Sequence, residues 1–131
     1  MAAIHRFTGT PERPEWDGVE PRAYDLGEAV AGTKRVLVGP DDGAGNFALR
    51  YFEIVPGGKS SLDLHDHDHG IVIVKGRARV LIGRETHELG PGDVAYIGGR
   101  QEHQLTNLGD GALGFLCVNP ARGTGPAGSR P

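Results

Sequence analysis

Apolar and polar residues alternate along most of this chain in short runs, and a turn interrupts them about every ten residues. In the clearest run, Ala78, Val80 and Ile82 share one face of an extended segment, and two arginines share the other. No stretch repeats its apolar residues at the 3.6-residue spacing of an amphipathic helix. The pattern therefore predicts strands. They are expected at 34–38, 47–55, 60–65, 70–74, 77–82, 86–89, 94–97, 101–106 and 112–118.

Glycine and proline supply the turns between these strands. The chain has 22 glycines and 9 prolines in 131 residues, about a quarter of its length, without the Gly-X-Y period of collagen. Two runs, 70–74 and 94–97, are apolar at nearly every position, and we expect both to be buried on both faces. Many short strands joined by tight turns predict an all-β barrel or sandwich, which leaves few sheet edges exposed.

Three segments differ in character. Residues 1–32 are weakly patterned and are expected to form an extension that packs on the barrel or on a partner subunit. Residues 33–119 carry the strand rhythm and are expected to form one domain. Residues 120–131 contain no apolar side chain larger than alanine, which is typical of a disordered tail.

Charge and cysteine content exclude several classes of function. A net charge of −3 gives no electrostatic reason to expect binding to nucleic acid or to an anionic membrane. The only cysteine, Cys117, cannot form an internal disulfide and is expected in the core, as fits a reducing compartment. No apolar run reaches the length of a membrane span. We therefore expect a soluble, cytoplasmic protein.

A cluster of histidines and aspartates concentrates the chemistry of the chain. Four of its members alternate, so they would share one face of an extended segment: Asp63, His65, His67 and His69. Imidazoles turned toward an apolar interior need hydrogen-bond partners or a metal ion, and Asp63, Asp66 and Asp68 could orient the rings. A polar loop with a chance run of these residues is the alternative. His103, at the start of a later strand, favours the metal because such a strand can face the cluster across a small barrel.

Two spaced motifs in this region resemble those of the small single-domain cupins. The first cupin motif reads G-x5-H-x-H-x3/4-E-x6-G, and its positions hold Gly57, Asp63, His65, His69 and Gly76. The second reads G-x5-P-x-G-x2-H-x3-N, and its positions hold Gly92, Gly98, Arg100, His103 and Asn107. The resemblance covers about residues 34–119. It implies a cupin-type double-stranded β-helix, or jelly-roll barrel, and a homodimer paired through outer strands.

The departures from the first motif leave two ligand sets open. Asp63 stands where the family has its first metal histidine, and His69 stands where it has glutamate. In this register Asp63, His65, His69 and His103 are the ligands. A register shifted by two residues gives an all-histidine set, His65, His67, His69 and His103, as in some small manganese or copper cupins. The shifted register leaves only one residue between His67 and His69 for a turn.

Either set implies one divalent transition metal ion per chain, and iron, manganese, copper, nickel and zinc all suit such ligands. The resemblance implies a metal-dependent oxygenase that acts on a small organic substrate with O2. A non-catalytic metal or small-molecule sensor is one alternative, and a metal-assisted isomerase or lyase is another. Tyr96 and Gln101 are the polar candidates for catalysis. The expected apolar wall comprises Phe47, Tyr51, Ile71, Ile73, Tyr96, Leu105, Phe115 and Cys117.

Overall fold

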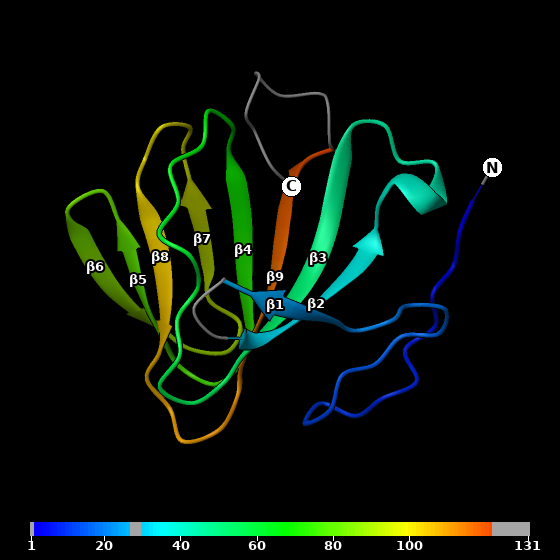
Figure 1. The fold of residues 1–131 in the computed structure, drawn as a ribbon, viewed down its shortest axis with the longest axis horizontal. Coiled ribbons are helices and arrows are strands. Elements are labelled where there is room, and N and C mark those ends of the chain that lie inside the picture. Colours follow the sequence, from blue (N-terminus) through cyan, green and yellow to red (C-terminus); the bar gives the residue numbers. More distant parts are fainter. Residues whose placement is uncertain (1, 27–29, 122–131) are drawn as a thin grey trace.

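The computed structural model describes residues 2–26 and 30–121 and is built almost entirely from antiparallel strands (Figure 1). The elements are β1 (Arg22–Asp25), β2 (Val30–Val38), the 3-10 helix η1 (Pro40–Asp42), β3 (Phe47–Ile54), β4 (His69–Lys75), β5 (Ala78–Ile82), β6 (Glu85–Leu89), β7 (Val94–Ile97), β8 (His103–Asn107) and β9 (Leu113–Pro120). Within the described residues, no helix has the length and hydropathy that a membrane span requires.

The strands form two sheets that enclose the core. One has the order β1-β2-β3-β9-β4-β7 and the other the order β6-β5-β8 (Figure 1). Inward-facing residues of both sheets meet in one apolar cluster, which includes Ile54, Ile73, Val80, Leu105 and Leu113. Burial of this cluster stabilises the fold through the hydrophobic effect. The predicted all-β jelly-roll barrel is confirmed.

The predicted strand at 60–65 is wrong. This segment runs beside β8 without forming a continuous ladder. Two isolated bridges join this part of the chain to β8, one between Lys59 and Thr106 and one between Asp63 and His103. Side chains replace part of the ladder, since the Ser60 hydroxyl accepts a hydrogen bond from the backbone N–H of Leu105 at 2.9 Å. The segment is therefore a loop that is tied to β8 at separate points.

The prediction that 70–74 and 94–97 are buried on both faces is also wrong. Ile71, Ile73 and Ile97 point into the core, but Val94 and Tyr96 on β7 are 70% and 67% exposed. Each strand therefore has one buried and one outward face. The outward residues are apolar, which is why the pattern imitated full burial.

Part of the N-terminal segment packs on the outer face of the larger sheet, and β1 extends that sheet at its edge. Trp16 packs against Tyr51 of β3 with ring centroids 5.3 Å apart, and Glu15 accepts a hydrogen bond from Arg35 of β2 at 3.1 Å. Strand β1 pairs with β2, so the sheet begins before residue 33. Of the expected tail, Pro120 ends β9 and Ala121 is buried; residues 122–131 lie outside the described residues.

Candidate metal centre

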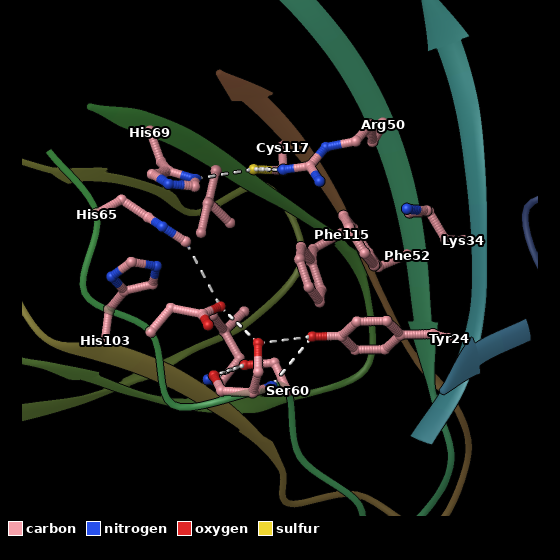
Figure 2. Close-up of a pocket in the computed structure, with 14 residues that line it drawn as sticks. Tyr24, Lys34, Arg50, Phe52, Ser60, His65, His69, His103, Phe115 and Cys117 are labelled. Atoms are coloured by element: carbon pink, nitrogen blue, oxygen red, sulfur yellow. Dashed lines mark hydrogen bonds and ion pairs between the residues drawn. The ribbon is translucent and has the colours of Figure 1, made fainter. Parts of the chain in front are cut away.

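Three histidines from separate parts of the chain converge at one end of the barrel interior (Figure 2). His65 lies in the loop before β4, His69 is the first residue of β4, and His103 is the first residue of β8. Each offers one ring nitrogen, and these three nitrogens lie within 4.8 Å of one another. Three imidazole nitrogens at this spacing could hold one transition metal ion.

Backbone contacts bring the loop to the strands. Asp63 and His103 exchange hydrogen bonds, with the Asp63 N–H donating at 3.0 Å and the His103 N–H at 2.9 Å. On the other side, the backbone N–H of Arg100 donates to the carbonyl of His65 at 2.5 Å. Arg100 adopts a left-handed conformation, with φ of 65°, at the position where the cupin motif has glycine. The turn at 98–100 thus places His65 beside His103.

Asp66 and Asp68 serve this turn, which corrects the expectation that they orient the rings. Asp66 accepts a hydrogen bond from the Arg100 guanidinium at 2.6 Å. Asp68 accepts one from the backbone N–H of Gly99 at 3.0 Å and one from the Tyr96 hydroxyl at 2.8 Å. Both acids therefore hold the loop and the turn together.

The ring nitrogens of two histidines have the pattern expected of metal ligands. His103 donates from Nδ1 to the carbonyl of Gln101 at 2.9 Å, which leaves Nε2 as the basic nitrogen. His69 contacts Cys117 Sγ through Nδ1 at 3.4 Å, and its Nε2 is buried with no hydrogen-bond partner. A buried, unpartnered nitrogen is costly, and a metal ion at the cluster would satisfy it. The residues present therefore fit a metal ion.

Burial favours the neutral form of His65 and His69. It lowers the pKa of His69 to about 3, with the other histidines of the cluster adding to the effect. Burial also lowers the pKa of His65, against an opposing influence of the Asp63 carboxylate. Because only a neutral imidazole can bind a metal, the site is prepared for the ion at neutral pH.

His67 and Asp63, the two candidates for a fourth ligand, both lie beside the triad and outside the group of three nitrogens. The His67 ring stacks on His65 and His69 with centroids 4.9 Å away, and both of its nitrogens are buried without a partner. The Asp63 carboxylate lies 3.7 Å from His65 Nε2 and accepts a hydrogen bond from the Ser61 hydroxyl at 2.5 Å. Of these two side chains, only that of Asp63 has hydrogen-bond or ion-pair partners for its polar atoms.

The triad opens into a cavity of about 210 Å³ between the two sheets (Figure 2). Four of the predicted wall residues line it: Ile71, Leu105, Phe115 and Cys117. The other four do not, because Tyr51 and Tyr96 point outward from the sheet, Ile73 lies deeper in the core, and Phe47 is half exposed at the start of β3. Cys117 is buried, as predicted for a core residue.

Neither predicted catalytic side chain lies in the cavity. Tyr96 is 67% exposed, and Gln101 is exposed and accepts a hydrogen bond from the backbone N–H of Gly98 at 2.9 Å. Their catalytic roles stay predictions. Sequence reasoning missed five polar residues that do line the cavity: Tyr24, Lys34, Arg50, Ser60 and Ser61. For Arg50 a signal was present, because it alternates with Phe52 and Ile54 on the apolar face of β3.

Comparison with known proteins identifies the family. Residues 50–119 match the family model described as the cupin domain. The chain belongs to the cupin family. This cupin is 42% identical, over 106 residues, to a 1-methylthio-D-xylulose 5-phosphate methylsulfurylase from Rhodospirillum rubrum, with 79% of this chain and 67% of the relative covered.

Solved structures agree with this assignment. A cupin-2 domain protein from Rhodospirillum rubrum is 37% identical, with a TM-score of 0.75 over 87% of this chain and 77% of that one. A cupin 2 conserved barrel domain protein from Rhodopseudomonas palustris is 31% identical, with a TM-score of 0.75 over 90% and 80%. The polyketide cyclase RemF from Streptomyces resistomycificus is 27% identical, with a TM-score of 0.70 over 79% and 74%.

Proposed function

We propose that this cupin is a metal-dependent enzyme that acts on a small organic substrate inside the barrel. One observation carries the proposal: three imidazoles converge on a cavity, and a buried nitrogen of one of them has no hydrogen-bond partner. One divalent ion of iron, manganese, copper, nickel or zinc per chain is the expected cofactor. A cytoplasmic location and a homodimer belong to the same proposal.

The Rhodospirillum rubrum relative supports a particular chemistry. Its name describes a substrate with a methylthio group at one end of a five-carbon ketose and a phosphate ester at the other. At 42% identity, we favour a group-transfer or elimination reaction on a substrate of this class over the predicted oxygenase. The oxygenase is the second candidate, because the three histidines and a fourth protein ligand would still leave two positions at a six-coordinate metal for O2 and substrate.

The residues of the chain supply binding and exclusion of water. His65, His69 and His103 would hold the metal, which when bound would polarise a carbonyl or hydroxyl oxygen of the substrate. Apolar side chains of Ile71, Leu105, Phe115 and Phe52 form the wall that keeps water from the reacting atoms. At the other end, the Tyr24 hydroxyl accepts a hydrogen bond from the backbone N–H of Ser61 at 3.0 Å. That contact joins β1 to the loop that carries His65.

Metal content and turnover test the proposal together. The full chain would be purified as wild type, as His69→Ala, and as His87→Ala, whose histidine is exposed on β6. We expect about one metal ion per chain in the wild type and in His87→Ala, and a loss of most of it in His69→Ala. Turnover of 1-methylthio-D-xylulose 5-phosphate, followed by NMR, should parallel the metal content.

Each deviation has a distinct meaning. Metal retained in His69→Ala would contradict the site itself. Metal bound without turnover of the sugar phosphate, but with metal-dependent O2 uptake on other organic substrates, would favour the oxygenase. Metal bound with neither activity would favour a non-catalytic sensor.

A further inference from the structure

Arg50 is a buried cation without a counter-charge. Its side chain points from β3 into the barrel and is 7% exposed, and its Nε has no hydrogen-bond partner. None of the ion pairs among the described residues includes it. The groups that its guanidinium contacts are uncharged: Nη2 donates to Cys117 Sγ at 3.5 Å, and the guanidinium carbon lies 5.0 Å from the centre of the Phe52 ring.

A buried arginine on the neighbouring strand has the carboxylate partner that Arg50 lacks. Arg35 of β2 faces the other side of the sheet and is 8% exposed, but its Nε donates to the Glu15 carboxylate at 3.1 Å. Burying a charge costs free energy unless an opposite charge and hydrogen bonds compensate. The thiol and the aromatic ring near Arg50 compensate in part only, since neither carries a net charge.

Arg50 also stands between two cavities. It lines the cavity of about 210 Å³ that contains the histidine triad, and it lines a second one of about 530 Å³ between the N-terminal segment and the inner face of β2 and β3. Lys34 of β2 lines both cavities as well. Figure 2 shows Arg50 reaching toward Cys117 from the side of the pocket opposite the histidines. The Arg50 guanidinium is therefore available to a ligand in the cavity that contains the triad.

We infer that Arg50 is the anion-binding residue of this pocket and selects substrates that carry a compact oxyanion, a phosphate ester or a carboxylate. The planar guanidinium binds either group through paired, charge-assisted hydrogen bonds. The neutral part of the substrate would then extend toward the triad. Identification of this ligand as the substrate rests on the proposed function, whereas anion binding at Arg50 does not.

The test uses the full chain without metal, so that an anion cannot bind to the metal instead. Inorganic phosphate and, in a second arm, acetate would be titrated at about pH 8 and constant ionic strength, with calorimetry and the melting temperature as readouts. We expect phosphate to bind the wild type and raise its melting temperature. In Arg50→Met, binding should weaken about tenfold or more and the thermal shift should disappear.

The starting stability separates this role from a structural one. Because Arg50→Met removes an uncompensated buried charge, its melting temperature without phosphate should equal or exceed that of the wild type. Arg35→Met, the matched control, should melt lower, because it leaves Glu15 without its partner, and should keep the phosphate-induced shift. Arg50→Lys keeps the positive charge but loses the planar guanidinium with its paired donors, so it should bind phosphate with intermediate affinity. This variant provides the comparison if Arg50→Met does not fold.

Wild-type affinity for phosphate in both Arg50 variants would overturn the inference, and so would a metal-free wild type that binds neither phosphate nor acetate. A response to acetate in place of phosphate would support Arg50 as the anion site and identify a carboxylate as the preferred group. Absence of turnover in the metal-loaded enzyme would contradict the proposed function and leave the binding result intact.

Discussion

At the scale of single residues, the members of the histidine cluster differ in what their polar atoms contact. Asp63 has partners for its carboxylate in Ser61 and His65. His67 is 7% exposed, with both ring nitrogens unpartnered. An unsatisfied buried imidazole is costly, and a metal ligand bond would remove that cost. We therefore predict that His67 is the fourth ligand and that Asp63 orients His65.

Metal affinity separates these two roles. His67→Ala should weaken binding of Mn²⁺ or Zn²⁺ about a hundredfold or more, whereas Asp63→Ala should weaken it about tenfold, as loss of a partner of a ligand does. Competition with a chelator measures both. The reverse order of effects would assign the fourth position to Asp63.

The lowered pKa of His69 predicts how the metal-free protein responds to acid. In the unfolded chain this group titrates near 6.5, but in the folded protein its pKa is about 3, chiefly because of burial. Between these values the unfolded state binds more protons than the folded state, so the free energy of unfolding falls as the pH falls. The pKa values of His65 and His67 are lowered as well and act in the same direction.

We expect urea unfolding of the metal-free protein to give a free energy of unfolding that declines as the pH falls below about pH 6.5. His69→Gln should make the decline shallower, because this group then no longer contributes. His87→Gln, at an exposed site, should leave the decline unchanged. An unaltered decline in His69→Gln would show that other groups cause it.

At the scale of elements, alternation predicts which face of a strand is buried, but it fails where the backbone is not extended. The chain bends at Asp66 and His67, so residues 65, 67 and 69 do not keep one common orientation. The triad therefore takes His65 from a loop and His69 from β4, with His67 beside them. The sequence indicates that Arg50 is a charged residue on an apolar strand face. It does not indicate that Arg50 lacks a counter-charge, because that depends on contacts between strands.

The N-terminal segment is held by a contact that depends on pH. His5 pairs with Asp42 of η1 at 2.7 Å, and its other ring nitrogen lies 3.0 Å from the Asp17 carbonyl. Both contacts raise the pKa of His5, and the hydrogen bond with Asp42 has the larger effect. The protonated ring is therefore favoured in the folded protein, and its contribution is complete below about pH 6.5 and lost as the pH rises through the raised pKa.

Trp16, the only tryptophan, reports on this segment because it packs on Phe7 and Tyr51. We expect quenching of its fluorescence by acrylamide to increase from about pH 6 to pH 9. His5→Ala should show stronger quenching than the wild type at pH 6 and a smaller difference from it at pH 9, and His87→Ala should behave like the wild type. Equal quenching of wild type and His5→Ala at low pH would mean that the ion pair does not hold the segment.

At the scale of the whole molecule, the outer face of the larger sheet leaves apolar side chains exposed at its β7 end. Val94 and Tyr96 of the edge strand β7, and Val118 of β9, are 70%, 67% and 43% exposed. The register aligns them, because Gly70 of β4 lies between Tyr96 on one side and Val118 on the other. An exposed apolar area of this kind is typical of an interface.

The predicted homodimer is therefore expected to form through this face, which the N-terminal segment of the same chain does not cover, since that segment lies on β2 and β3. Light scattering should give twice the mass of one chain. Val94→Glu should shift the protein to the monomer. Burial of an unpaired carboxylate in an apolar interface is expected to cost more free energy than the rest of the interface contributes to association. Leu62→Glu, at a similarly exposed leucine in the loop before β4, should leave the dimer intact. If the wild type is a monomer, the predicted dimer does not form. If Val94→Glu dimerises with the same affinity as the wild type, this apolar face is not the dimer interface.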